Sequence, residues 1–187
     1  DLGEARRRLT RAHEELAESE LKFSNLFQNL SDAVLVADME SGMISDANTE
    51  ACRLTGYRIT ELRTMHFHQL HPDQHVAYVE DLFRRMIAGS ETHQTYDITL
   101  RRKDGKSIPA EIVYGGSFTA GGRGYAIGIF RDVTELRKTM QERQRNAEYL
   151  QAVLDSAHDA VFVDDADTGE IVDVNRSMCE MYGYTRE

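Results

Sequence analysis

The sequence predicts an α+β domain with a five-stranded antiparallel sheet, flanked on either side by a long helix of coiled-coil character. Two observations predict this architecture. The hydrophobic pattern runs in the order helix, two strands, helices, three strands, helix, and the last strands carry the alternation and turn signals of antiparallel pairing. The stretch from Asp32 to Tyr57 also recurs without a gap from Asp159 to Tyr184, so a whole small domain begins twice.

The repeat sets the expected domain organisation. Identical residues stand at matching positions of the two copies: Asp32/Asp159, Val34/Val161, Asp38/Asp165, Gly42/Gly169, Asn48/Asn175, Cys52/Cys179, Gly56/Gly183 and Tyr57/Tyr184. The second copy stops at Glu187, where the first continues, so we expect one complete module and the truncated start of another. We assign residues 1–22 to an N-terminal coiled-coil helix, 23–136 to the complete domain, 137–157 to a connecting helix and 158–187 to the truncated domain.

Composition narrows the class of protein. Apolar residues make up 41% and charged residues 29% of the chain, as in an ordinary globular protein. A net charge of −10 argues against a nucleic-acid surface. No apolar run is long enough to span a membrane, and the start has no signal-peptide pattern. Cys52 and Cys179 occupy equivalent positions, so we expect two buried thiols in a reducing, cytoplasmic compartment.

Both long helices carry heptad patterns. In the first, from about Gly3 to Asn29, one seam repeats every seven residues at Leu2, Leu9, Leu16, Phe23 and Leu30, with Ala5, Ala12, Ser19 and Leu26 three positions after the first four. The second, from the Asp132 region onward, repeats at Val133, Met140, Ala147 and Leu154 and at Leu136, Arg143, Leu150 and Ala157. We expect a homodimer through these helices. The alternative to a dimer is that only residues 23–30 of the first helix pack, and that they do so against the domain that follows.

The first half of the domain contains two strands and a capped helix. Asp32 to Asp38 is apolar on both alternating sets, so both faces should be covered, and Met43 to Ala47 follows as a second strand. Asn48 stands where an N-cap belongs, and Gly56 where a left-handed residue ends the helix. A further short helix is expected around Ile59 to Met65.

The second half contains a longer helix and three strands. His71-Pro72-Asp73 opens the helix, and its apolar stripe is Val76, Val79, Phe83 and Met86. Tyr96 to Leu100 alternates as a strand, Asp104-Gly105 is a hairpin turn, and Ile108 to Tyr114 returns, with Pro109 indicating that its start lies at an edge. We expect a loose connection over Gly115–Gly124 and a last strand over Tyr125–Arg131. Asp132-Val133-Thr134-Glu135 has the form of a capping box.

The order of motifs resembles a PAS domain across about Leu21 to Leu136, with the start of a second copy behind it. The motifs are DAVLVAD, DAN at 46–48, LTGY at 54–57, LHPD at 70–73, RRKDGKSIPAEI at 101–112 and GIFRDVTELRK at 128–138. Arg58 departs from the family, which often has a capping Ser or Thr there, and this leaves the start of the next helix open.

The resemblance implies a sensory function. PAS domains sense ligands or mediate protein contacts within histidine kinases, cyclic-dinucleotide enzymes and transcription regulators, so we expect a bacterial-type signalling protein with a separate output domain. It implies a cavity between the sheet and the helices near Cys52 and Val79, with a signal leaving through Asp132 and Thr134. The candidate pocket residues are Val36, Leu54, Leu70, Val79, Phe83, Ile98, Leu100, Ile112, Tyr114, Ile127 and Ile129.

The cofactor is not specified by the sequence, and we expect none. Flavin-photosensing relatives have a cysteine in the segment that is Thr64–Leu70 here, where it is absent. Haem-sensing relatives use a histidine well inside the long helix, where this chain offers only His75 in the first turn, so haem is a minor alternative. His66, His68, His71 and His75 are close in sequence, but we expect a solvated loop, with His71 and His75 weak metal candidates and a pH response conceivable if the group is partly buried.

Catalytic chemistry has little support. Gly121-Gly122-Arg123-Gly124 precedes a strand and not a helix, so it lacks the context of a phosphate-binding loop. We therefore expect a non-enzymatic sensory module. The rival hypothesis is a ligand-free structural spacer between sensor domains, whose core is filled by its own side chains such as Tyr96, Tyr114, Phe83 and Met86.

Overall fold

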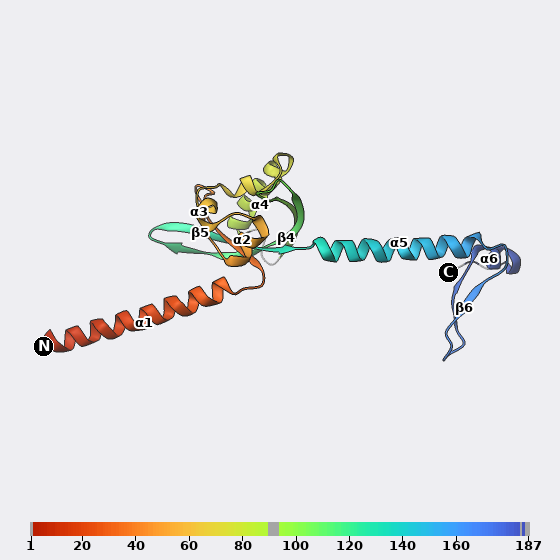
Figure 1. The fold of residues 1–187 in the computed structure, drawn as a ribbon, viewed down its shortest axis with the longest axis horizontal. Coiled ribbons are helices and arrows are strands. Elements are labelled where there is room, and N and C mark those ends of the chain that lie inside the picture. Colours follow the sequence, from red (N-terminus) through yellow and green to blue (C-terminus); the bar gives the residue numbers. More distant parts are fainter. Residues whose placement is uncertain (1, 90–93, 184, 186–187) are drawn as a thin grey trace. The chain divides into compact units, whose positions relative to one another are not determined.

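The computed structural model describes residues 2–89, 94–183 and 185, and for Leu2, Gly3 and Ala5 the backbone only. Tyr184, the last residue of the second repeat, and the end at Glu187 lie outside the described residues. The chain divides into two compact units, residues 1–134 and 135–187, which are described separately (Figure 1).

The first unit contains the predicted five-stranded antiparallel sheet. Its strands lie in the order β2-β1-β5-β4-β3, and every neighbouring pair is antiparallel. Their bounds are β1 Ala33–Asp38, β2 Ile44–Ala47, β3 Thr95–Arg101, β4 Ser107–Ala120 and β5 Arg123–Asp132. The central strand β5 therefore connects the early β1–β2 pair to the late β3–β4 pair, which confirms the α+β fold.

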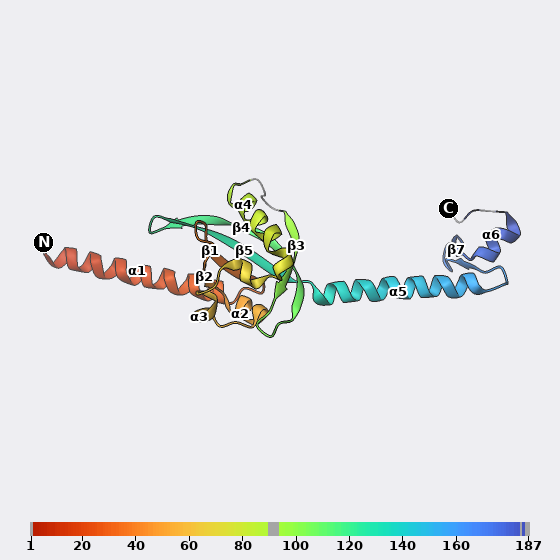
Figure 2. The ribbon, with the colours of Figure 1, turned by 90° about the horizontal axis from the view of Figure 1, so that it is seen from above.

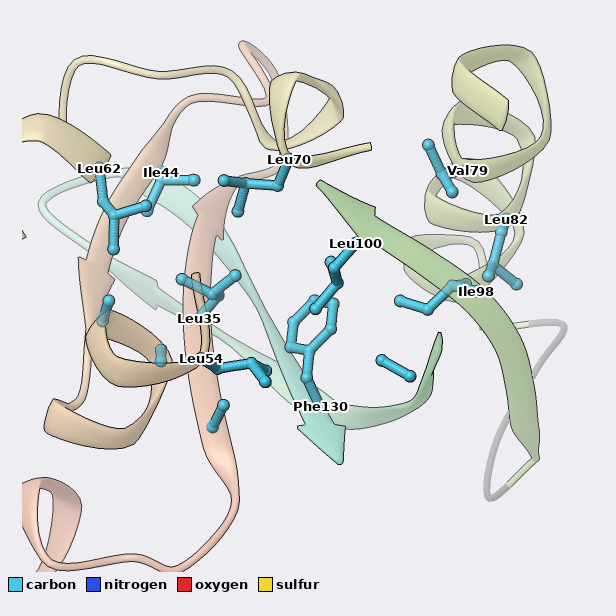
Figure 3. Close-up of a cluster of buried hydrophobic side chains, with 14 of the residues drawn as sticks. Leu35, Ile44, Leu54, Leu62, Leu70, Val79, Leu82, Ile98, Leu100 and Phe130 are labelled. Carbon is cyan, nitrogen blue, oxygen red and sulfur yellow. The ribbon is translucent and has the colours of Figure 1, made fainter. Parts of the chain in front are cut away.

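Helices cover one face of this sheet (Figure 2). The N-terminal helix α1, Leu2–Gln28, precedes the sheet. The covering helices and two 3₁₀ turns follow β2; they are α2 Thr49–Thr55, α3 Ile59–Leu62, η1 Phe67–Leu70, η2 Asp73–His75 and α4 Val76–Ile87. Figure 3 shows the core between the helices and the sheet, where Leu35 and Phe130 from the strands face Leu54, Leu62 and Leu82 from the helices. Leu82 is buried in α4 although the predicted stripe omitted it.

The predicted start of the domain is confirmed in detail. All six residues of β1 are buried, so both of its faces are covered. The Asn48 side chain caps α2 by accepting from the Ala51 N–H, and Gly56 ends the helix with φ of 78°. At α3, the Glu61 carboxylate accepts from the Arg58 N–H at 2.9 Å. The Arg58 side chain has no acceptor and cannot cap the Glu61 N–H, which donates instead to the Arg58 carbonyl oxygen at 2.9 Å.

The expected loose connection over Gly115–Gly124 is wrong. β4 and β5 continue to a two-residue turn at Gly121-Gly122, where both φ angles are positive, as a tight hairpin turn requires. The ladder shifts register between Tyr114 and Gly116, so Gly115 is the extra residue of a bulge. The Phe118 and Tyr125 rings stack across the extended hairpin.

Smaller expectations also need correction. Met43 is an isolated bridge to His66 and not part of β2. Cys52 and Cys179 are half-buried free thiols and not fully buried ones. The start of β4 does not lie at an edge, as Pro109 had indicated. Pro109 pairs with Thr99 of β3 on one side, and on the other side its carbonyl accepts from the Val133 N–H, just beyond the β4–β5 ladder.

The second unit repeats the opening of the first. It contains the helix α5 Thr134–Ser156, which begins at the unit boundary, the antiparallel pair β6 Phe162–Asp164 and β7 Ile171–Val174, and the helix α6 Arg176–Tyr182. Asn175 caps α6 and Gly183 ends it in the left-handed conformation. Asn175 and Gly183 thus play the parts that Asn48 and Gly56 play in the first unit.

Candidate functional site

The first unit encloses an apolar cavity of about 50 Å³ between the covering helices and the inner face of the sheet. The cavity is lined by Leu35, Ala37, Ile44, Phe67, Leu70, His71, Val79, Leu82, Phe83, Met86, Ile98, Ile112, Tyr114, Ala126, Ile127, Gly128 and Phe130. Small side chains make room for it, because Ala37 of β1 pairs directly with Ala126 of β5 and Leu35 with Gly128. Large residues of α4 and η1 then form its roof.

Most of the predicted pocket residues lie around this cavity. They are Leu70, Val79, Phe83, Ile98, Ile112, Tyr114 and Ile127. Leu54 and Leu100 are buried in the same core but do not line the cavity. Val36 and Ile129 do not line it, although Ile127, which the β1–β5 register pairs with Val36, does.

His71 is a cavity residue that the pocket prediction omitted. Its side chain is only 4% exposed, so the expected solvated loop is wrong at this position. Nδ1 lies 2.8 Å from the backbone carbonyl oxygen of Thr99. Thr99 belongs to β3, the edge strand, and its carbonyl points away from β4, because the Pro109 carbonyl opposite it faces the other way and accepts from the Val133 N–H. His71 therefore satisfies a backbone acceptor at the edge of the sheet.

Burial also sets the protonation state of His71. Desolvation, with smaller contributions from the charges of His75 and His68, lowers the pKa of His71 to about 4, although the bond to Thr99 acts in the opposite direction. The ring is consequently neutral at physiological pH.

Two other histidines of the cluster, His66 and His68, connect the segment around η1 to neighbouring elements. His68 Nδ1 lies 2.9 Å from the Glu80 carboxylate of α4. The His66 ring packs over Gly42 in the β1–β2 turn, and burial followed by repulsion from His68 lowers the pKa of His66. Across the described ranges, no three His, Cys, Asp or Glu side chains are placed to hold a metal ion together.

The geometry bears on the cofactor hypotheses as well. Cys52 does not line the cavity, and burial raises the pKa of its thiol, which leaves it a weak nucleophile. His75, the haem candidate, lies in η2 and does not line the cavity either. A cavity of about 50 Å³ is also far too small for a tetrapyrrole without repacking of the core.

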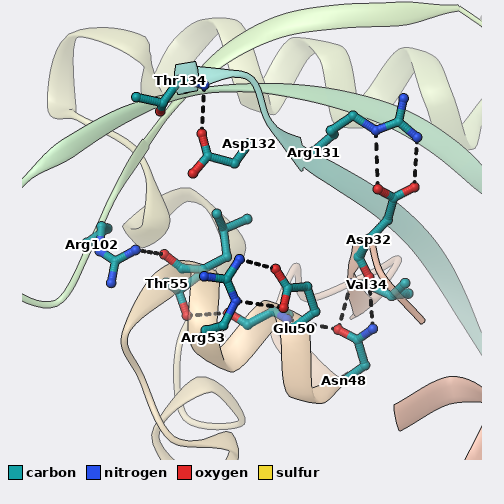
Figure 4. Close-up of polar contacts among 12 residues, drawn as sticks. Asp32, Val34, Asn48, Glu50, Arg53, Thr55, Arg102, Arg131, Asp132 and Thr134 are labelled. Carbon is teal, nitrogen blue, oxygen red and sulfur yellow. Dashed lines mark hydrogen bonds and ion pairs between the residues drawn. The ribbon is translucent and has the colours of Figure 1, made fainter. Parts of the chain in front are cut away.

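The predicted relay residues lie where β5 leaves the sheet (Figure 4). Asp132 is the last residue of β5, and its carboxylate accepts from the Thr134 N–H at 2.8 Å. This bond spans two residues, while the Glu135 carboxylate pairs with Lys138, so an Asx turn stands in place of the predicted capping box. Val133 between them is buried at 2% exposure.

An ion pair joins the two ends of the domain at the same place. Arg131 of β5 donates through Nε and Nη2 to both carboxylate oxygens of Asp32, at 3.2 and 2.9 Å. Glu50 and Arg53 form a second exposed pair on α2. The start of β1 and the end of β5 are thereby fastened together next to the point where α5 begins (Figure 4).

The sheet order, the cavity beneath α4 and the helix that continues from the last strand define a small α+β domain of the sensory signalling class. The chain belongs to the PAS family: the family model described as PAS fold matches residues 21–133, and a second, described as PAS domain, matches residues 148–187. This confirms a PAS domain followed by a second, truncated copy.

Individual relatives agree with the family assignment. The chain is 25% identical over 143 residues to a methyl sulfide methyltransferase-associated sensor from Methanosarcina acetivorans, covering 76% of this chain but only 14% of that protein. The PAS domain of an HTR-like protein from Haloarcula marismortui superimposes with a TM-score of 0.55 at 22% identity, covering 66% of this chain and 98% of that one.

A PAS domain from Desulfitobacterium hafniense gives a TM-score of 0.52 at 24% identity, over 58% of this chain and 98% of its own. At these identities the solved structures establish the fold alone. Within the described residues, no helix has the length and apolar character needed to cross a membrane.

Proposed function

We propose that residues 23–136 sense a small ligand in the cavity and relay its presence through Asp132 and Thr134 to α5. The domain would serve a larger, cytoplasmic, bacterial-type signalling protein whose output domain is a histidine kinase or a cyclic-dinucleotide enzyme. In this proposal the domain itself catalyses no reaction, and residues 1–22, 137–157 and 158–187 are a coiled-coil helix, a connecting helix and the start of the next sensor.

The course of β5 is the observation that carries this proposal. Ala126, Gly128 and Phe130 line the cavity, and the same strand ends at Asp132, which holds the first turn of α5. A ligand that displaces Phe130 therefore moves a strand whose end is fixed to α5. Small shifts of a packed strand can be amplified in this way where a junction has two arrangements.

The substitution Asp132→Ala tests the relay. It removes the acceptor of the Thr134 N–H and should destabilise the start of α5 by about 1 kcal/mol, as losses of helix caps do. We expect faster amide exchange in the first turn of α5 and an output that no longer responds to the input. Asp104→Ala is the matched control, because Asp104 accepts from the Lys106 N–H in the same i to i+2 arrangement in the β3–β4 turn, outside the β5–α5 junction. An Asp132→Ala protein with unchanged stability and unchanged regulation contradicts the relay.

We further propose that the sensor dimerises through its flanking helices. The described seam residues of α1 are exposed in the single chain, with values of 72% for Leu9, 56% for Leu16 and 70% for Phe23. A partner helix would remove this apolar surface from water. Sedimentation should give a dimer at micromolar concentration, and Leu16→Glu should dissociate it, while Glu14→Lys, at the heptad position farthest from the seam, should not. A monomer in the unaltered protein contradicts this assignment.

The structural spacer is the second candidate because the cavity is small and much of its lining belongs to the buried core of the domain. An absorbance spectrum and a native mass spectrum of freshly purified protein separate the two. A coloured band or an added bound mass supports the sensor, whereas a bare dimer that no candidate ligand stabilises supports the spacer.

A further inference from the structure

The cavity offers one polar atom whose chemical role is fixed by the structure. Apart from His71 and the half-buried Tyr114, every side chain that lines it is apolar. The carbonyl oxygen of Thr99 can only accept, so in the neutral His71 ring the proton lies on Nδ1, which donates to it at 2.8 Å. Nε2 is then an acceptor, and among the described residues the His71 side chain makes its hydrogen bond through Nδ1 alone.

The neutral ring selects the kind of ligand that can approach Nε2. Because burial holds the pKa of His71 near 4, the ring accepts a hydrogen bond at neutral pH and does not attract anions. A carboxylate or phosphate offers Nε2 only further acceptors and would lose its hydration in an apolar lining. An uncharged donor meets the acceptor and keeps the rest of its surface in contact with apolar side chains.

We propose that the cavity binds a small uncharged molecule with an apolar body and one hydrogen-bond donor, of the short-chain alcohol class, which donates to Nε2 of His71. This deepens the proposed function and rests on it, since it names the ligand class of the same cavity. Size limits the ligand further: an engineered cavity of about 150 Å³ admits benzene. A cavity of about 50 Å³ therefore suits a molecule of only a few heavy atoms.

Ethanol and dimethyl ether test the donor directly, because they are isomers of similar size and only ethanol can donate. We expect ethanol, titrated into the full chain, to shift the nitrogen NMR resonance of His71 Nε2 saturably. We expect it to bind about five- to tenfold more tightly than dimethyl ether, which corresponds to one hydrogen bond.

Two variants make the test specific to Nε2. His71→Asn retains an amide donor close to the position of Nδ1, for the Thr99 carbonyl, but has no group at the position of Nε2. We expect it to bind the two isomers equally, with amide spectra that show an intact fold. His75→Asn is the matched control, because His75 does not line the cavity, and it should keep the preference for ethanol.

Three outcomes overturn the proposal. The isomers bind the unaltered protein equally, as they would if the Tyr114 hydroxyl donated to either oxygen. The preference for ethanol persists in His71→Asn. Neither isomer shifts the resonances of cavity residues in a saturable manner. In each case the relay remains open to its own test, because the response of α5 to Asp132→Ala does not depend on which ligand the cavity takes.

Discussion

Replacing Asn48 with alanine should destabilise the first unit more than any single surface substitution. The Asn48 side chain is completely buried and makes three hydrogen bonds. Oδ1 accepts from the N–H groups of Val34 and Ala51, each at 2.9 Å, and Nδ2 donates to the Asp32 carbonyl oxygen at 2.9 Å. One side chain therefore joins the start of β1 to the first turn of α2 (Figure 4).

The size of the effect follows from the groups that are left behind. In Asn48→Ala the Val34 and Ala51 N–H groups stay buried without an acceptor, and each such group costs about 1–3 kcal/mol. We expect a loss of about 3–5 kcal/mol in the free energy of unfolding, which is a large share of the stability of a small domain. Asn48→Asp keeps both acceptor bonds but sets a carboxylate oxygen against the Asp32 carbonyl, so it should recover stability only when acid protonates the new side chain.

The assay is urea unfolding followed by circular dichroism, together with amide exchange of Val34 and Leu35 to report on β1 locally. Thr49→Ala is the control, because the neighbouring Thr49 hydroxyl donates only to the exposed Gln28 side chain and its loss should cost little. An Asn48→Ala protein that is within about 1 kcal/mol of the unaltered chain would refute the reasoning, because one orphaned donor alone should cost that much.

Three further predictions follow from burial and backbone geometry. Because unfolding raises the pKa of His71 from about 4 to 6.5, the unfolded chain binds an extra proton between these values. Stability should therefore fall by about 3 kcal/mol as the pH drops through this window, and urea unfolding of His71→Asn should lack this part of the slope. Gly42→Ala should lower the melting temperature more than Gly105→Ala, because both have positive φ but only at Gly42 would a Cβ overlap the His66 ring; equal shifts contradict the close packing. The Val161 N–H donates to the Asn175 side chain at 2.8 Å, so Asn175→Ala should speed amide exchange at Val161 by at least about tenfold. Unchanged exchange contradicts the role of Asn175 in holding the start of β6.

The parts of the fold that were predictable from sequence are those set by neighbouring residues. Asn48 and Gly56 have the required residue types at the ends of α2, and their backbone conformations agree with the prediction. The continuous burial of β1 followed from apolar residues on both of its alternating sets. The long β4–β5 hairpin was missed although a signal existed, because Gly121-Gly122 suits a two-residue turn with positive φ. Gly115 and Gly116 suggested a loop instead of a continuing strand, because a β-bulge and a loop can both be rich in glycine.

The cavity was less predictable, because its volume depends on pairings between segments far apart in sequence. Nothing near Ala37 indicates that Ala126 lies opposite, and only the β1–β5 register brings the two small residues together. His71 was misjudged for a related reason. Its proximity to His66 and His68 suggested a polar loop, whereas its partner is a carbonyl of the edge strand β3, which a pattern of side chains does not reveal.

Comparing the two copies of the repeat distinguishes the hydrogen-bond network that stabilises the fold from the residues that line the cavity. Asn175 makes the same contacts in the second unit as Asn48 makes in the first: it accepts from Val161 and Met178 N–H groups and donates to the Asp159 carbonyl. Within its described residues the second unit forms this network with two strands and the helices beside them, so the network is encoded locally and carries no information about a ligand. Most of the cavity lining, by contrast, comes from Phe67 through Phe130, a segment for which the second unit has no described counterpart. Differences in the proposed ligand between PAS copies of this protein should therefore be sought in that segment. Of its two polar lining residues, His71 and Tyr114, His71 is the buried one, and its exchange is expected to change the ligand without disturbing the Asn48 network.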